Sequence, residues 1–122
     1  MKGTTGIGID LVDVSRIEKA LERRPRLAGR LFTDDEIAYS RARRRPARHL
    51  AARFAAKEAV FKALGLAPGT AMREIEIVAG SPPGVRLHDS AARFASERGL
   101  EVRVSLSHER ETATAVAIAG EA

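Results

Sequence analysis

Two acidic residues stand out in this sequence because each lies where a carboxylate is unusual. Asp10 follows two glycines in GIGIDLVDV, an alternating stretch typical of a β-strand, in which aspartate is disfavoured. Glu58 lies in ARFAAKEAVFKALG, residues 52 to 65, a helical pattern that is otherwise largely apolar. A strand carboxylate and a helix carboxylate of this kind suit a hard cation. Mg²⁺ fits best, because it is held by one or two carboxylates and takes its other ligands from water and substrate phosphates.

Three cations surround Glu58 in the same stretch: Arg53, Lys57 and Lys62. We expect them to bind the phosphate groups of a substrate. Carboxylates, metal and cations together indicate phosphoryl transfer. Lys62 lies one helical turn after Glu58, in the orientation that favours an ion pair. The alternative is therefore an ordinary surface ion pair between these two residues, which would contribute only about 0.3–0.5 kcal/mol.

A further candidate lies near the C-terminus, in SLSHE, residues 105 to 109. Ser107 and His108 end a predicted strand and enter a turn, where side chains reach solvent or a cleft. An isolated histidine is more often structural than functional, and we interpret His49 and His88 in that way. His108 differs because a hydroxyl group neighbours it.

Hydrophobic periodicity predicts the elements that position these residues. Alternate residues of the first strand face opposite sides, with Ile7, Ile9 and Leu11 on one face and Gly8, Asp10 and Val12 on the other. Asp13 is placed to cap a helix whose apolar stripe is Ile17, Ala20 and Leu21. A capping box of Thr33 and Glu36 opens a second helix through about Arg43.

The long third helix runs from Pro46 to a terminal glycine, Gly65. At about 100° per residue, its alanines fall in a different sector from Glu58 and Lys62. This alanine sector (Ala55, Ala56, Ala59 and Ala63) allows close packing against a sheet or another helix.

The rest of the chain alternates between short strands and one helix. Residues 74–78 and 84–88 are predicted strands, and Asp89 is expected to cap a helix that ends near Gly99. The segments EVRVSLS and TATAVAIA form an antiparallel hairpin across the turn HERE. This order of elements predicts an α+β fold, in which an antiparallel sheet packs against helices.

Length and composition limit the possible functions. The 122 residues correspond to a single domain, residues 1–122, with 44% hydrophobic residues and no cysteine, which excludes a disulfide framework and a thiolate metal site. The N-terminal MKGTTGIGID lacks the apolar core of a signal peptide, and no apolar run approaches membrane-spanning length. We therefore expect a cytoplasmic protein without a membrane partner.

The net charge of +5 is unevenly distributed, because residues 41 to 62 contain eight cations and one acid, Glu58. Such a segment attracts a polyanion, such as nucleic acid, a phosphorylated cofactor or an acidic protein. A small basic nucleic-acid-binding protein is therefore one alternative, although aromatic residues for stacking make up only 4% of the chain. A metal-dependent nuclease is another, but its usual pattern places acid and lysine two residues apart on one strand.

Three blocks, in order, resemble the holo-acyl-carrier-protein synthases, which are small 4′-phosphopantetheinyl transferases: GIGIDLVDVSRI, ARFAAKEAVFKALG, and VSLSHE followed by ATAVAIA. The similarity covers almost the whole chain, and FAAKEA with the later S-x-S-H is its most specific part. The resemblance implies a 4′-phosphopantetheinyl transferase-like fold. It also implies transfer of phosphopantetheine from coenzyme A to a serine of apo acyl carrier protein, with release of adenosine 3′,5′-bisphosphate and without a nucleic-acid partner.

The resemblance assigns catalytic roles to three residues. Asp10 and Glu58 correspond to the Mg²⁺ ligands, and Lys62 corresponds to a lysine that contacts the pyrophosphate. The proton of the carrier serine would go to Glu58, directly or through a water, or to Asp10 through a water, and both routes stay open. The preferred carrier, from fatty-acid or polyketide synthesis, also stays open.

The resemblance further assigns binding residues. Coenzyme A would be contacted by Arg53, Lys62, Gly65, Ser107 and His108. Arg16 corresponds to an arginine of the first helix that grips the acidic carrier, helped by Arg23 and Arg26. The family's chains form homotrimers with sites between subunits, which would supply the deep pocket that one small domain lacks.

Two segments depart from the family pattern. Arg103 stands where relatives often have histidine, and AGSPPGVRL replaces a turn of the Asn-Gly-Lys-Pro type. Pro82, Pro83 and Gly84 therefore say little about a site. Neither change touches the expected metal ligands or the expected phosphate-binding cations.

Overall fold

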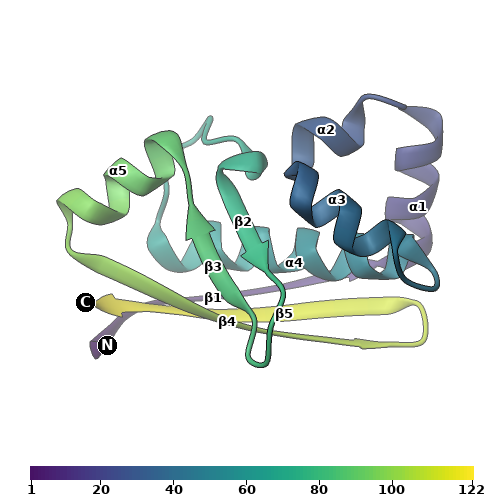
Figure 1. Ribbon diagram of the computed structural model, residues 1–122. Helices are drawn as coiled ribbons and strands as arrows, with labels where there is room; N and C mark the ends of the chain where they lie inside the picture. The colour runs from purple at the N-terminus through teal and green to yellow at the C-terminus, as the bar shows by residue number, and fades with distance from the viewer.

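The computed structural model describes all 122 residues, in five strands, five α-helices and one 3-10 turn (Figure 1). The strands are β1 (Lys2–Asp13), β2 (Ile75–Val78), β3 (Gly84–Leu87), β4 (Leu100–Glu109) and β5 (Thr112–Glu121). The helices are α1 (Val14–Arg23), α2 (Leu27–Leu31), α3 (Asp34–Arg41), α4 (Pro46–Leu64) and α5 (Asp89–Glu97), with the 3-10 turn η1 at Met72–Glu74. None of the helices is long and apolar enough to cross a membrane.

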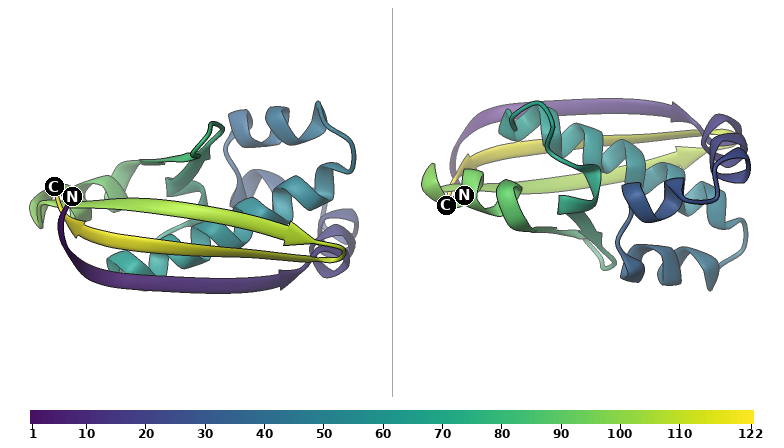
Figure 2. Two further views of the ribbon diagram at one scale, coloured as in Figure 1. Left: turned by 90° about the horizontal axis from the view of Figure 1, so that it is seen from below. Right: turned by 90° about the horizontal axis from the view of Figure 1, so that it is seen from above.

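The main sheet has three antiparallel strands in the order β1-β5-β4, and β2 pairs with β3 in a separate small sheet. Helix α4 runs across one face of the main sheet, and helices α1 to α3 gather near one end of it (Figure 1). The small sheet and α5 lie on the same side as α4, so the other face of the main sheet is uncovered (Figure 2, left). The predicted α+β architecture, with an antiparallel sheet packed against helices, is confirmed.

Glycines in β1 let this strand lie directly on α4. A Cβ atom on Gly8 would lie 2.0 Å from the carbonyl oxygen of Ala59, and one on Gly6 would lie 1.9 Å from that of Ala63. The neighbouring strand β5 contributes its own buried alanines to the core: Ala113, Ala115, Ala117 and Ala119. The predicted alanine sector of the helix therefore packs against a sheet surface of glycine and alanine, and the two backbones come close together.

A buried ion pair attaches the side of α4 that faces away from the main sheet to α3. The Nζ atom of Lys57, whose side chain is 0% exposed, lies 2.6 Å from Oε1 of Glu36. It also donates to carbonyl oxygens in η1 and at the start of β2. Glu36 in turn accepts hydrogen bonds from the backbone N–H groups of Thr33 and Ile77. The expectation that Lys57 binds a substrate phosphate is wrong, because its ammonium group is buried and engaged by these partners.

Several boundaries differ from the sequence expectation. Helix α3 ends at Arg41, and the five-residue helix α2 leaves no recognisable period in the sequence. Asp89 is the first residue of α5, with φ 49°, and His88 takes the N-cap position instead. Strand β4 continues through Glu109, so the hairpin turn is tighter than HERE, and Arg110 within it has φ 54°.

The uncovered face of the main sheet carries exposed apolar side chains. Ile7, Ile9 and Leu11 of β1 are 69%, 67% and 70% exposed, and Val116 of β5 lies opposite Ile9 in the strand register. Contiguous apolar surface of this kind marks an interaction site, because leaving it in water is unfavourable.

The glycine contact generates a first prediction. Gly8→Ala should lower the free energy of unfolding by about 1–3 kcal/mol or more, because the added Cβ would collide with the backbone of Ala59. Gly29→Ala in α2 is the matched control, since a Cβ there meets nothing within 4 Å and alanine favours a helix. Urea unfolding followed by circular dichroism gives both values. Equal midpoints for the two variants would contradict the close contact.

Candidate active site

The two predicted metal-binding carboxylates lie together in a groove bounded by β1, α1, α2 and α4. Asp10 comes from β1 and Glu58 from α4, and both line this groove of about 800 Å³. Its apolar lining includes Ile17, Ala20, Leu27, Leu31 and Phe54. The glycine contact explains why a strand carboxylate and a helix carboxylate meet here, since it brings β1 directly onto the helix.

Lys62 links the strand to the helix at this groove. Its Nζ atom donates to the carbonyl oxygen of Ile9 at 2.9 Å and lies 3.3 Å from Oδ1 of Asp10. Its side chain is 51% exposed, so the ammonium group can still face an anion from solvent. The ion pair that Lys62 makes is therefore with Asp10, and the simple surface pair between Lys62 and Glu58 does not form.

The electrostatics of the groove favour a cation. Burial raises the pKa of Glu58 above its ordinary value of 4.5, the charge of Asp10 raises it further, and Lys62 opposes both effects. Two carboxylates that repel each other in a half-buried groove would both be neutralised by a bound cation. Two carboxylates are a donor set that fits Mg²⁺, because this ion leaves its remaining positions to water and phosphate oxygens.

Arginines of α1 line the same groove. Arg16 and Arg23 both contribute to its wall, together with Arg24. Arg26 instead lines a separate hollow at the start of α2. The structure thus places two of the three predicted carrier-binding arginines beside the carboxylates and the third outside the groove.

Arg53 and His108 belong to a second cluster. His108 lies on the edge strand β4, its ring centroid 6.3 Å from that of His49. His49 lies 6.1 Å from the ring of Tyr39, and the guanidinium group of Arg53 lies over that ring. His49 is therefore not isolated, and its interpretation as a structural histidine stays a prediction. Periodicity gives no signal for Tyr39, whose ring contacts His49 and Arg53 of α4.

Besides Lys62, two more of the predicted coenzyme A contacts, Ser107 and Gly65, lie apart from this cluster. Ser107 is on the uncovered face of the main sheet, where the register places it opposite Thr114. Arg103 shares that face because it lies four residues earlier on the same strand. Gly65 ends α4 in the left-handed conformation, with φ 68°, close in sequence to Lys62.

One chain therefore does not bring all the predicted residues together. Asp10 lies on one edge strand of the main sheet, and His108 lies on the other, with β5 between them. The groove that contains Asp10 and Glu58 is lined by neither Arg53 nor His108. The candidate site is divided into an acidic half and a basic half.

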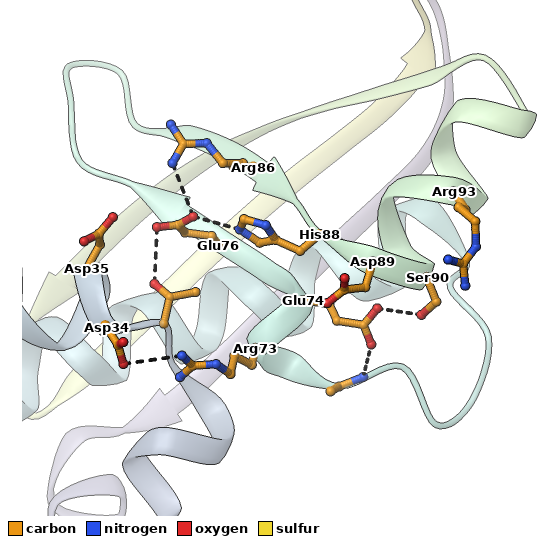
Figure 3. Close-up of a pocket in the computed structure, with 12 residues that line it drawn as sticks. Asp34, Asp35, Arg73, Glu74, Glu76, Arg86, His88, Asp89, Ser90 and Arg93 are labelled. Carbon is orange, nitrogen blue, oxygen red and sulfur yellow. Dashed lines mark hydrogen bonds and ion pairs between the residues drawn. The ribbon is translucent and has the colours of Figure 1, made fainter.

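A further polar cavity lies between the start of α3, η1, β3 and α5 (Figure 3). Its charged side chains largely pair with one another. Glu76 lies 2.9 Å from Nε2 of His88 and 3.4 Å from Arg86, and Arg73 lies 3.3 Å from Asp34. Glu76 thereby joins β2 to β3 and to the N-cap of α5, and Arg73 joins η1 to α3, so these charged side chains hold neighbouring elements together.

The comparisons with known proteins agree with this geometry. The model of the 4′-phosphopantetheinyl transferase superfamily matches residues 6–118. The chain belongs to this superfamily. Among curated relatives, the holo-acyl-carrier-protein synthase of Moorella thermoacetica is 50% identical over 115 residues, which cover 91% of this chain and 90% of that protein.

Solved structures of superfamily members confirm the expected transferase-like fold. The acyl carrier protein synthase of Mycobacterium tuberculosis is 36% identical with a TM-score of 0.80, over 98% of this chain and 100% of that one. The holo-acyl-carrier-protein synthase of Helicobacter pylori, solved in complex with coenzyme A, is 28% identical with a TM-score of 0.79. That match covers 93% of this chain and 99% of the other.

The raised pKa of Glu58 predicts how the stability of the metal-free protein depends on pH. The stability that protonated Glu58 contributes is present below pH 4.5 and is lost as the pH rises through its higher folded-state pKa. Glu58→Gln should therefore match or exceed the stability of the wild type at pH 7. The same change at the exposed Glu97 should have no effect of this kind.

Thermal unfolding in the presence of EDTA, at pH 4 and pH 7, measures this effect. The advantage of Glu58→Gln over the wild type should appear at pH 7 and shrink at pH 4. A variant less stable than the wild type at pH 7 would show that the carboxylate is engaged favourably in the fold.

Proposed function

We propose that this protein is a holo-acyl-carrier-protein synthase. It would transfer 4′-phosphopantetheine from coenzyme A to a serine of apo acyl carrier protein and release adenosine 3′,5′-bisphosphate. The observation that carries the proposal is the carboxylate pair of Asp10 and Glu58 in a groove lined by arginines, in a chain of this superfamily. The names of its relatives, and the coenzyme A bound to one of them, support the same substrates.

The groove can be assigned roles in the reaction. The serine oxygen of the carrier attacks the β-phosphorus of coenzyme A, and the bond to the 3′,5′-bisphosphate breaks as the new bond forms. Asp10 and Glu58 would hold Mg²⁺, which when bound supplies charge neutralisation at the pyrophosphate. The exposed ammonium group of Lys62, 3.3 Å from Oδ1 of Asp10, would share that task.

A base must accept the serine proton. Glu58 is the proposed base, directly or through a water, because its carboxylate lines the groove and makes no ion pair. Asp10 acting through a water is the alternative, although its carboxylate is already engaged by Lys62.

We also propose that the active unit is a homotrimer with sites between subunits. The exposed face that carries Ile7, Ile9 and Leu11 offers the apolar surface that such an assembly would bury. The acidic and basic halves of the site lie at opposite edges of this sheet. A neighbouring chain packed against the sheet could bring its basic half to the acidic half of the first.

The first test is the reaction itself. Incubation with coenzyme A, Mg²⁺ and apo acyl carrier protein should add the mass of one phosphopantetheine to the carrier, as read by intact mass spectrometry. Glu58→Gln should reduce turnover by roughly 10²-fold or more, because a charge facing the metal is lost. Carriers of several types that all stay unmodified, while the protein binds RNA tightly, would favour the nucleic-acid-binding alternative.

Carrier recognition is tested by charge reversal on α1. Arg16→Glu should raise the KM for the acidic carrier and weaken the salt dependence of the rate, because charges of this kind govern encounter. The KM for coenzyme A and the unfolding midpoint should stay nearly unchanged. Arg93→Glu on α5 carries the same change in net charge away from the groove and serves as control. If the affinity for coenzyme A falls instead, Arg16 belongs to the cofactor side of the site.

The assembly is tested at the uncovered face. Sedimentation equilibrium of the wild type should give about three times the chain mass of 13.2 kDa. Ile9→Asp should give monomers with little activity, because the side chain is 67% exposed in one chain and its change should affect packing between chains. Ile9→Val should stay assembled. An active monomeric variant would rule out a site built between subunits.

A further inference from the structure

The contact between α4 and β1 consists of small residues. Ala59 and Ala63 of the helix lie against Gly8 and Gly6 of the strand, where a Cβ atom would already collide. This contact sets the distance between the helix and the sheet, but it has no large side chains that interlock. Larger apolar residues such as Val60 also pack in the core, but apolar contacts are not directional and tolerate small rearrangements. Apolar packing therefore sets the rotation of α4 about its own axis only loosely.

Lys57 makes directional contacts on the other side of the helix. Its Nζ atom lies 2.6 Å from Oε1 of Glu36 and 3.1 Å from the carbonyl oxygen of Met72, and it also donates to the carbonyl oxygen of Ile75. An ammonium group has three N–H donors, so each donor has an acceptor. The side chain is 0% exposed, so its stem cannot swing through solvent to follow a turned helix. Because hydrogen bonds weaken steeply when stretched or bent, these contacts fix the direction in which Lys57 leaves α4.

The acceptors of Lys57 are themselves held in place. Glu36 of α3 is 2% exposed, and its two carboxylate oxygens accept from the backbone N–H groups of Thr33 at 2.8 Å and Ile77 at 2.9 Å. The two carbonyl oxygens belong to the backbone of η1 and of the start of β2. Three elements outside α4 therefore hold a single side chain of this helix.

Glu58 depends on the rotation of α4 for its own position. It follows Lys57 directly, about 100° further around the helix axis, and lines the groove together with Asp10. Its carboxylate lies at the end of a side chain, far from the axis, so a small turn of the helix moves it more than the backbone. Glu58 makes no ion pair that would hold it in one direction. Ligands of one cation must be placed to within about 0.5 Å, so such a turn would separate the two carboxylates of the site.

We propose that Lys57 is a positioning residue, which fixes the rotation of α4 and thereby holds Glu58 where it can share one cation with Asp10. The proposal rests on the proposed function, in which these two carboxylates hold Mg²⁺. It also gives the buried pair of Lys57 and Glu36 a role other than stability. Replacing such a pair by apolar residues of similar volume is often neutral or stabilising, so stability alone does not require it. Apolar residues would fill the same space without fixing one orientation of the helix.

The test removes both buried charges together, in a double variant that combines Lys57→Met with Glu36→Gln. Neither partner is then left as an unpaired buried charge, so the chain should still fold. Mn²⁺ is the probe, because it takes the same oxygen ligands as Mg²⁺ and its binding is read by electron paramagnetic resonance without coenzyme A or turnover. The double variant should bind Mn²⁺ about tenfold more weakly than the wild type, because a group that orients a metal ligand is lost.

Turnover gives a second readout. In the double variant, the Mg²⁺ concentration for half-maximal turnover should rise by about the same factor, roughly tenfold. The kcat at saturating Mg²⁺ should change little, because a bound cation selects the productive orientation of Glu58. A fall in kcat that no Mg²⁺ concentration restores would contradict a positioning role toward the cation.

Val60→Ala is the matched control for loss of stability. It shortens a fully buried side chain of α4 and should lower the unfolding midpoint, but it leaves the contacts of Lys57 in place. Its affinity for Mn²⁺ should equal that of the wild type. If Val60→Ala weakens Mn²⁺ binding as much as the double variant does, general loosening of α4 explains the effect and the positioning role is overturned.

Glu36→Gln alone takes the place of the double variant if the latter does not fold. Its amide oxygen can still accept from Lys57, but its amide nitrogen cannot accept from a backbone N–H group, so the frame around Lys57 is weakened rather than removed. This variant should bind Mn²⁺ about threefold more weakly than the wild type. An unchanged affinity would overturn the proposal.

Binding and turnover together separate this proposal from the proposed function. A wild type that modifies the carrier, with a double variant that binds Mn²⁺ equally well, would overturn the positioning role alone. A wild type whose Mn²⁺ affinity depends on Lys57 as expected, but which modifies no carrier, would overturn the proposed function alone. A wild type that binds no Mn²⁺ at all would overturn both.

Discussion

The missing side chains of Gly6 and Gly8 set the geometry on which the rest of the structure depends. Any Cβ atom at either position would lie about 2 Å from a carbonyl oxygen of α4, so only glycine allows this strand to touch this helix. The contact fixes the height of β1 on α4, and therefore the place of Asp10 relative to Glu58. Lys62 reaches the backbone of β1 for the same reason, because its Nζ atom meets the carbonyl oxygen of Ile9.

The charged residues of helix α4 face different neighbours because they lie on different sides of the helix. At about 100° per residue, the alanines face the sheet, Glu58 faces the groove, and Lys57 points into the buried pair with Glu36. Arg53, more than one turn earlier, reaches Tyr39. A single helix thus serves both halves of the site and also carries the ion pair that fastens it to α3. Such a pair would be costly if broken, because an unpaired charge would remain buried.

The sequence predicted those features for which the local residue pattern and the contacts in the folded chain agree. Alternation in β1 and the capping signals gave the elements, and the unusual positions of Asp10 and Glu58 indicated a site that the fold brings together. Lys57 was misassigned because helical periodicity shows which side a residue faces but not what covers that side. Its partner Glu36 lies 21 residues away in the chain. The cluster of Tyr39, His49, Arg53 and His108 is built from α3, α4 and β4, so the spacing of residues within one element does not predict it.

The electrostatic state of the single chain gives a physical reason for dividing the site. Asp10 of β1 and Glu58 of α4 line the same groove, where burial and then the charge of Asp10 raise the pKa of Glu58. In the other half, burial lowers the pKa of His49, and the charges of Arg53 and His108 lower it further. Asp10 is partly compensated by Lys62, whereas Glu58 makes no ion pair in the single chain. Within one chain, β5 keeps the halves apart. In the proposed homotrimer, a neighbouring chain would supply the basic half to the groove of Asp10 and Glu58, which one chain of this size cannot do because β5 lies between the two edges.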